Sequence, residues 1–270
     1  MIVAVTLCPR RATFAPMLYT GQLEYGLRRA AELGCDGVEF NIQDPTKMDV
    51  KALAQQVASL GLRVTGLGTG QAYLEEGLSL ADPTPEVRAA VRARLQAQVD
   101  LATRVGGAAV ILGGIRGRFD GPQETWPAQR AAAVETARAV ADYAAMHKVI
   151  LLVEPINRYE ANFVNSVDEA LALIEEIGSD NVHLLIDTFH MNIEEPSLAE
   201  SIRTAGPRLA YVHLVDSNRW AAGFGHTDFD TVFSALHEIG YDGPVCAEVL
   251  PLPDDDTAIR QHVRFVRAHW

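Results

Sequence analysis

Residues 150–154 read ILLVE, a short apolar run that ends in a carboxylate. Three comparable runs follow, VHLLID at 182–187, YVHL at 211–214 and PVCAE at 244–248. At or near their carboxyl ends the four runs carry, in chain order, Glu154, Asp187, His213 and Glu248. Successive members of this set lie 33, 26 and 35 residues apart, about the length of one strand–helix–strand unit. Repeated units of this length predict a parallel sheet with intervening helices.

The same pattern extends over the whole chain and predicts eight strands. The short apolar runs are 2–7, 37–40, 63–67, 108–112, 150–154, 182–187, 210–215 and 245–249. Helical patterns that stop before a glycine lie between them, at 22–33, 50–60, 85–105, 166–177 and 229–239. Eight strands alternating with about eight helices, without a linker rich in proline or serine, predict a single (β/α)8 TIM barrel domain over residues 1–270.

The competing fold is a doubly wound open sheet with a glycine-rich nucleotide loop. The segment 113–117 (GGIRG) lacks both the Lys-Ser/Thr of a phosphate loop and GxGxxG spacing, so it does not supply that loop. Two predicted loops, 68–83 and 113–127, exceed the usual connection of about 4–6 residues. They follow the third and fourth strands and are either lids over the barrel mouth or solvated surface.

The composition argues against a nucleic-acid-binding or membrane-associated protein. The chain has 23 Lys and Arg against 35 Asp and Glu, a net charge of −12. Such a balance disfavours binding to nucleic acid or to anionic membranes, because both need cationic side chains. Three widely spaced cysteines without a CxxC motif do not suggest a disulfide framework. The amino terminus reads as a buried strand rather than a leader, and no apolar run has membrane-spanning length, so we expect a cytoplasmic protein.

In a closed barrel the ends of four successive strands would converge on one mouth, where active sites of such barrels lie. Three carboxylates there would repel one another without a cation, and burying them unpaired would be costly. An oxygen-rich set with one imidazole suits Mn²⁺, Mg²⁺ or Co²⁺ better than structural zinc. Singly, each residue has a simpler explanation: Glu154 as a helix cap, Asp187 as a strand-end charge, or His213 as a hydrogen-bonded core histidine.

More polar residues follow these strand ends. They are Asn157, Arg158 and Glu160 after Glu154, His190 and Asn192 after Asp187, and Asp216, Asn218 and Arg219 after His213. Such donors and acceptors suit a polyhydroxylated ligand. Tyr159 and Trp220 could pack against a sugar's apolar face or anchor loops. Arg219 could instead pair with Asp216 or Glu248.

Several of these segments resemble the D-tagatose 3-epimerase-like branch of the xylose isomerase-like TIM barrels. They are EPINRYE (154–160), DTFHMNIEE (187–195), HLVDSNRWAAGFGHTDF (213–229) and AEVLPL (247–252). GTGQAYLEEGLSL (68–80) and IRGR (115–118) resemble most the 5-keto-L-gluconate epimerase group within that branch. His226 departs from the residue found in many ketose epimerases of the branch, so the preferred sugar stays open.

The resemblance implies a divalent metal held by Glu154, Asp187, His213 and Glu248, with substrate contacts from Glu160, His190 and Arg219. It also implies a homodimer or homotetramer. The expected reaction is inversion of the stereocentre next to the ketone through an enediolate, with Glu154 and Glu248 as two acid/bases. Arg116, with Arg118 nearby, is a candidate contact for a substrate carboxylate; the alternative is a pair of solvated loop arginines.

The sequence leaves three alternative functions to be weighed against an epimerase. An aldose–ketose isomerase, including a hydroxypyruvate isomerase-like enzyme, uses the same enediolate chemistry and can work with one base. A metal-dependent apurinic endonuclease would need extra histidine ligands and a basic groove, against which the net charge of −12 argues. A non-catalytic sugar-binding module could dispense with Glu154 or Glu248, yet both are present.

Overall fold

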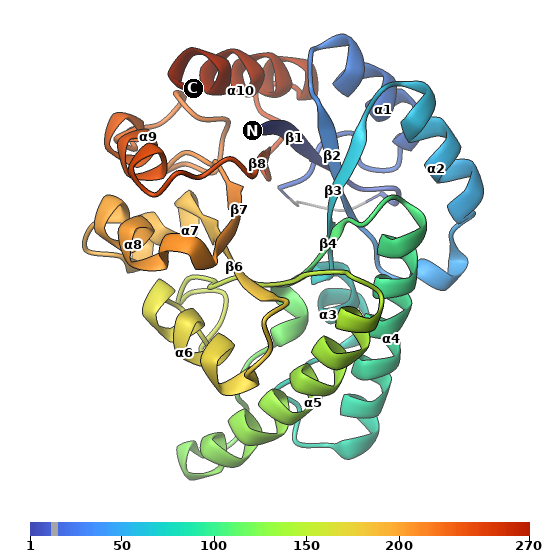
Figure 1. Ribbon diagram of the computed structural model, residues 1–270, viewed down its shortest axis with the longest axis vertical. Coiled ribbons are helices and arrows are strands. Elements are labelled where there is room, and N and C mark those ends of the chain that lie inside the picture. The colour runs from blue at the N-terminus through green and yellow to red at the C-terminus, as the bar shows by residue number, and fades with distance from the viewer. Residues whose placement is uncertain (12–15) are drawn as a thin grey trace.

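Eight parallel strands close into a barrel in the computed structural model, which describes residues 1–11 and 16–270 (Figure 1). In chain order they are β1 (Ile2–Leu7), β2 (Gly37–Asn41), β3 (Arg63–Gly68), β4 (Ala109–Leu112), β5 (Leu151–Val153), β6 (Val182–Asp187), β7 (Leu209–His213) and β8 (Pro244–Ala247). Each strand pairs with the next, and β8 completes the ring against β1, with Ile2 opposite Pro244. The predicted TIM barrel is therefore confirmed, and each predicted apolar run overlaps one strand.

Within the described part of the chain, ten α-helices surround the barrel (Figure 1). They are α1 (Leu23–Glu32), α2 (Val50–Ser59), α3 (Gly70–Glu76), α4 (Pro85–Arg104), α5 (Trp126–Met146), α6 (Val167–Ile177), α7 (Thr188–Glu194), α8 (Leu198–Ala205), α9 (Phe229–Glu238) and α10 (Asp255–His269). Short 3-10 helices are η1 (Pro45–Lys47), η2 (Gly114–Arg116), η3 (Gln123–Thr125) and η4 (Gly206–Arg208). The five helices expected from the sequence are α1, α2, α4, α6 and α9.

The two long loops after β3 and β4 are partly helical and pack together. The first contains α3, and the second contains η2 and η3. The backbone N–H of Leu80 donates to the carbonyl of Ile115, joining the two segments. Gly70 and Gly114 approach closely, because a Cβ on Gly114 would lie 2.8 Å from the Cα of Gly70. These loops therefore form one hydrogen-bonded unit at the carboxyl ends of their strands.

The barrel interior is a packed core beneath the site. Alternate residues of the strands face inward, and Ala4, Ala109, Ile111, Leu152, Leu185, Tyr211 and Cys246 form a buried cluster there. A larger apolar cluster includes residues of both the strands and the helices. Four members of this cluster are each followed, two positions later in the sequence, by a residue of the predicted site: Glu154, Asp187, His213 and Glu248. The two-residue period of a strand thus directs all four inward, in the layer at the carboxyl ends.

Among the residues that the structure describes, none of the helices combines the length and the apolar composition that a membrane crossing requires. The amino-terminal segment expected to be a buried strand is β1, whose residues from Val3 to Leu7 are buried.

Candidate active site

The four strand-end residues converge at the mouth of the barrel. One ligand atom from each of Glu154, Asp187, His213 and Glu248 lies within 4.8 Å of all the others. The Nδ1 atom of His213 is 3.4 Å from Glu154 Oε1, 3.8 Å from Glu248 Oε2 and 4.0 Å from Asp187 Oδ2. These separations leave the four atoms arranged around a common centre with little direct bonding between them.

Two atoms of this cluster point to a cation as the missing partner. His213 Nδ1 and Asp187 Oδ2 are buried and have no hydrogen-bond partner among the described residues. Leaving a buried acceptor unsatisfied costs about 1–3 kcal/mol or more for a charged group. A divalent ion bound to three carboxylates and an imidazole would satisfy both atoms and offset the repulsion between the carboxylates. The donor set therefore fits the metal that the sequence predicts.

Burial sets the protonation of the cluster. It raises the pKa of Asp187 to about 7; His213 and Arg219 oppose this shift, and Glu154 reinforces it. Burial also holds the pKa of Glu248 well above its usual range, against the opposing charge of His213. For His213 burial alone would lower the pKa, but the neighbouring carboxylates of Glu39 and Glu248 raise it well above the usual value. Without a metal the cluster thus retains protons, which a bound cation would displace.

Another buried residue, Glu39 on β2, contacts His213 from the interior of the barrel. The sequence pattern did not identify it. Its Oε2 atom lies 2.8 Å from His213 Nε2, on the opposite side of the imidazole from the cluster. The other carboxylate oxygen accepts a hydrogen bond of 3.2 Å from Thr6 on β1. A charged residue in the middle of the buried run GVEFN is the sequence signal that could have identified it.

A second polar group borders the cluster of Glu154, Asp187, His213 and Glu248 and orients His190. The amide of Asn157 donates to His190 Nδ1 at 2.8 Å and to Glu160 Oε1 at 3.0 Å. Its Oδ1 accepts the backbone N–H of Tyr159, which fixes the amide orientation. The His190 proton is therefore assigned to Nε2, which lies 3.9 Å from Asp187 Oδ2. Burial, reinforced by Arg219, holds the His190 pKa well below its usual value, so the ring is a neutral donor.

Arg219 reaches the same group from the loop after β7. Its Nη1 donates to Glu160 Oε1 at 2.9 Å, and its guanidinium lies 4.8 Å from the ring centre of Phe189. Arg219 adopts a left-handed backbone conformation with φ of 63°, which is unusual for a residue other than glycine. The alternative of an ion pair with Asp216 or Glu248 is not what the structure has, since the guanidinium pairs with Glu160; the substrate contact stays a prediction.

Asp216 holds the loop that carries Arg219. Its carboxylate accepts backbone N–H groups from Ser217, Gly223 and Thr227 at 2.7–3.1 Å. Burial alone would raise the Asp216 pKa, but these hydrogen bonds keep it below its usual value. A charged acceptor with several backbone donors is a strong anchor, so Asp216 stabilises the strained conformation of Arg219.

The structure buries Arg116, which excludes the alternative of a solvated loop arginine for this residue. Its side chain is buried beside Leu112, Val153 and Phe163, in a narrow space between the outer face of the barrel and α5 and α6. Leu112 and Val153 alternate with inward-facing positions, so this space lies outside the barrel interior. Arg116 Nη2 donates to the backbone carbonyl of Glu154 at 2.7 Å, and burial lowers its pKa to about 10. It supports the end of β5 from behind rather than facing a ligand in the mouth.

Other polar residues near the strand ends serve loops or lie on the surface. Arg158 pairs with Glu194 at 2.7 Å, and the Asn218 amide donates to the carbonyl of Phe224. Asn192, His226 and Arg118 are exposed. Tyr159 is 78% exposed, whereas Trp220 is half-buried and meets the Phe224 ring edge-on. A sugar-stacking role for either aromatic residue stays a prediction.

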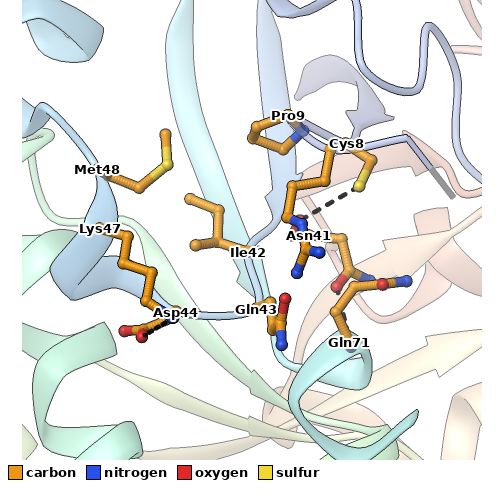
Figure 2. A pocket seen from close by; sticks show the side chains of 10 residues that line it. Cys8, Pro9, Asn41, Ile42, Gln43, Asp44, Lys47, Met48 and Gln71 are labelled. Atoms are coloured by element: carbon orange, nitrogen blue, oxygen red, sulfur yellow. Dashed lines mark hydrogen bonds and ion pairs between the residues drawn. The ribbon is translucent and has the colours of Figure 1, made fainter. Parts of the chain in front are cut away.

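A cavity of about 410 Å³ opens at the carboxyl ends of β1 and β2 (Figure 2). Its lining includes Cys8, Asn41, Met48 and Gln71, and Figure 2 shows the Asn41 and Gln71 side chains close together on one side. The backbone N–H of Gln71 donates weakly to Asn41 Oδ1 at 3.4 Å. Glycines stand at the ends of the intervening strands, at Gly68 on β3 and at Gly113 after β4. A Cβ on Gly113 would overlap Glu154 Oε2, and one on Gly68 would lie 3.1 Å from Asn41 Nδ2, so these two glycines make room for the Glu154 and Asn41 side chains.

The eight-stranded barrel carries three carboxylates and an imidazole, a set that could hold a metal ion, at adjacent strand ends, where enzymes with this fold have their active sites. The family model described as "Xylose isomerase-like TIM barrel" matches residues 27–269. The chain belongs to this family.

Several curated relatives are named as sugar epimerases, and a mouse relative that is 27% identical over 232 residues is named as a putative hydroxypyruvate isomerase. The chain is 34% identical over 225 residues to an L-ribulose 3-epimerase of Methylomonas sp. (strain DH-1), covering 81% of this chain and 75% of the relative. It is 34% identical over 241 residues to a ketose 3-epimerase of Arthrobacter globiformis, covering 86% and 81%. A 3-dehydro-D-guloside 4-epimerase of Escherichia coli is 27% identical over 229 residues, covering 82% and 84%.

Solved structures agree with this relationship. The crystal structure of a Methylomonas sp. D-allulose 3-epimerase in complex with D-allulose superposes with a TM-score of 0.86 at 27% identity. The superposition covers 100% of this chain and 97% of that one. The expected membership of the 3-epimerase-like isomerases is thus confirmed, and the relatives support a sugar epimerase activity.

Proposed function

We propose that the protein is a divalent-metal-dependent 3-epimerase of ketoses or keto-aldonates. The observation that carries the proposal is the convergence of Glu154 and Glu248 on one cluster with the unpartnered His213 Nδ1 and Asp187 Oδ2 atoms. Inversion needs a base on each face of the substrate carbon. Glu154 and Glu248 come from strands that are separated by β6 and β7, which suits them to opposite faces.

The metal site takes Mn²⁺ as the favoured ion, with Mg²⁺ or Co²⁺ as substitutes, because oxygen ligands predominate. When bound, the ion supplies Lewis-acid stabilisation of the negative charge that develops on the ketone and the adjacent hydroxyl. Glu154, Asp187, His213 and Glu248 would hold it. In the reaction one glutamate removes the proton from the carbon beside the ketone, and the other returns a proton to the opposite face of the enediolate.

The group around His190 would orient the substrate. The neutral imidazole offers its Nε2–H to the substrate oxygen, and Asn157 keeps that proton on Nε2 by donating to Nδ1. Arg219 and Glu160 form a hydrogen-bonded pair beside it and can bind hydroxyl groups. The cavity next to Asn41 and Gln71 would accept the end of the substrate chain away from the ketone, where amide side chains can exchange hydrogen bonds with hydroxyls.

Neutral ketoses are the first substrates to test, together with 5-keto-L-gluconate. Two of the named relatives are an L-ribulose 3-epimerase and a ketose 3-epimerase, which favours the neutral sugars. The segments at 68–80 and 115–118 are the reason to include the keto acid. The physiological compartment proposed for such an enzyme is the cytoplasm, and a homodimer or homotetramer is the proposed assembly.

The test is product analysis by chromatography after metal removal with EDTA and return of Mn²⁺. We expect metal-dependent conversion of a ketose to its C3 epimer. A product aldose would instead favour the aldose–ketose isomerase, and metal-independent conversion would contradict the proposed site. Absence of any product from ketoses, 5-keto-gluconates and hydroxypyruvate would overturn the sugar chemistry.

A further inference from the structure

Glu39 is a buried carboxylate inside the barrel with a contact to only one member of the metal cluster. Its side chain is 1% exposed, as is that of its partner His213, and their Oε2 and Nε2 atoms are 2.8 Å apart. Burying a carboxylate is costly unless hydrogen bonds compensate for the lost water. The position of Glu39 therefore calls for a physical explanation beyond the packing of β2.

The neighbouring strands leave space for this carboxylate. Gly66 on β3 has no side chain, and a Cβ there would lie 3.3 Å from both Cγ and Oε2 of Glu39. On the other side, Thr6 donates its hydroxyl to Glu39 Oε1 at 3.2 Å. Both carboxylate oxygens are thus engaged, one by Thr6 and one by the imidazole. This arrangement holds the carboxylate in a single orientation beneath His213.

The imidazole of His213 has two unlike sides. Its Nε2 faces Glu39, whereas Nδ1 faces Glu154, Asp187 and Glu248 and has no hydrogen-bond partner among the described residues. A proton on Nε2 that is donated to Glu39 leaves the Nδ1 lone pair available toward the cluster. Carboxylates that accept from the outer nitrogen of a metal-binding histidine fix its tautomer and ring orientation.

A competing arrangement would place the cation lower in the barrel. Glu39, His213 and Cys246 also bring potential ligand atoms within 4.8 Å of one another. In that set, however, both Glu39 oxygens already have partners, and Cys246 Sγ is 3.4 Å from the Thr6 hydroxyl. The unsatisfied atoms lie in the upper set instead, at His213 Nδ1 and Asp187 Oδ2. The contacts therefore favour the upper set as the metal site.

We infer that Glu39 is a positioning residue that acts through His213, holding the imidazole with Nδ1 directed toward a divalent cation. Thr6 holds Glu39 in turn, so the chain of contacts runs from β1 through β2 to β7. The inference rests on the proposed metal site, but it does not depend on which sugar the protein converts.

The experiment measures the Mn²⁺ dissociation constant of the full-length protein by the electron paramagnetic resonance signal of free Mn²⁺. Glu39→Gln keeps the side-chain volume but removes the charge, and we expect a dissociation constant about 10–100-fold higher than that of the wild type. Thr6→Val, which removes only the hydroxyl that holds Glu39, should shift the constant in the same direction by less. Thermal unfolding of the metal-free variants checks that both are folded.

Thr65→Val is the matched control. The Thr65 hydroxyl is also buried in the barrel, where it contacts Tyr211 OH at 2.7 Å, but it does not touch the metal cluster. Its loss should lower the melting temperature without changing Mn²⁺ affinity. One result would overturn the inference: the Glu39→Gln variant unfolds at a lower temperature but binds Mn²⁺ with a dissociation constant within about twofold of the wild-type value. Glu39 would then be a structural residue. Normal Mn²⁺ binding by a wild type without sugar turnover would overturn the proposed reaction instead.

Discussion

Glu154 and Glu248 are the residues whose side chains would carry protons to and from the substrate. Both lie in the layer above the apolar barrel core, and both face His213. Both stand at strand ends rather than inside the apolar layers of the barrel, so we expect the fold to tolerate their replacement by glutamine. Their replacement should therefore separate chemistry from folding.

Glu154→Gln or Glu248→Gln should lower kcat by about 10²–10⁴-fold or more, because each removes an acid/base and a metal ligand charge. Circular dichroism and thermal unfolding should show a folded barrel. Glu176→Gln is a suitable control, since Glu176 is a surface carboxylate paired with Arg130 at 2.8 Å. Wild-type kcat in either active-site variant would contradict the two-base mechanism.

Arg116 illustrates a second consequence at the residue scale. Because its guanidinium holds the Glu154 carbonyl from outside the barrel, Arg116→Met should reduce turnover of acidic and neutral substrates by similar factors. The variant should also lose about 1–3 kcal/mol of stability, as expected when a buried hydrogen bond is broken. Steady-state kinetics with 5-keto-L-gluconate and a neutral ketose makes the comparison. A KM increase confined to the acidic substrate would instead indicate direct recognition of a carboxylate.

At the scale of elements, strand ends were the most predictable part of the molecule. Short apolar runs with a polar residue at the carboxyl end predict both the strands and the inward layer, because a strand alternates with a period of two. The hydrogen bonds between loop residues of the site could not be predicted from the sequence. Asn157 contacts His190 across 33 residues, and Glu160 contacts Arg219 across 59, so only the folded chain brings them together.

The sequence pattern did not predict two short helices or the positions of the Arg116 and Glu39 side chains. The helices α3 and α7 have 7 residues each, which is too short for a helical period to be recognised in the sequence. The alternation of side chains along β4 does not extend to Arg116, because η2 follows the strand. The Arg116 side chain lies on the outer face of the barrel. Glu39 sits in the middle of an apolar strand, and its partner is 174 residues away. These features depend on tertiary contacts that periodicity does not contain.

Gly113 at the end of β4 provides a test at this scale. A Cβ there would overlap Glu154 Oε2, so Gly113→Ala should displace the carboxylate and weaken both Mn²⁺ binding and turnover, by about tenfold or more if one ligand is lost. Gly70→Ala is the control, because its Cβ would meet nothing closer than Asn41 Nδ2 at 3.7 Å. Calorimetric Mn²⁺ titration compares the two variants. Equal Mn²⁺ affinities would show that the glycine does not make room for Glu154.

At the scale of the whole molecule, protonation of the cluster links stability to pH. In the metal-free protein the pKa of Asp187 is about 7, against an ordinary value near 4. Between these values the folded state binds a proton that the unfolded state has released. The free energy of unfolding should therefore fall as pH rises through this window.

Comparison with Asp187→Asn isolates this contribution. The stability of the metal-free wild type relative to this variant should fall between pH 5 and 7 by about 1.4 kcal/mol per pH unit at most, as measured by urea unfolding. The buried His262, whose pKa is lowered to about 4, affects both proteins equally and cancels. A difference that rises with pH over this range would contradict the assigned protonation of Asp187.

Metal binding should show the opposite pH dependence. Because a bound cation displaces protons from the cluster, Mn²⁺ affinity should weaken below pH 7 by about tenfold per pH unit for each proton displaced. Titrations between pH 5.5 and 7.5 follow the change. A pH-independent affinity would argue against the buried cluster as the binding site.

The most direct measurement is proton exchange followed by NMR in D₂O, with Mn²⁺-loaded protein and an EDTA-treated control. The panel is ketohexoses, L-ribulose, 5-keto-gluconates and hydroxypyruvate. A two-base epimerase should place deuterium at the stereocentre next to the ketone (C3 of a 2-ketose, C4 of a 5-keto-gluconate) in a product with inverted configuration, only in the metal-loaded sample. Deuterium at C1 or C2 with an aldose product, or no exchange with any compound, would contradict the assignment of Glu154 and Glu248 as opposing acid/bases of a ketose 3-epimerase.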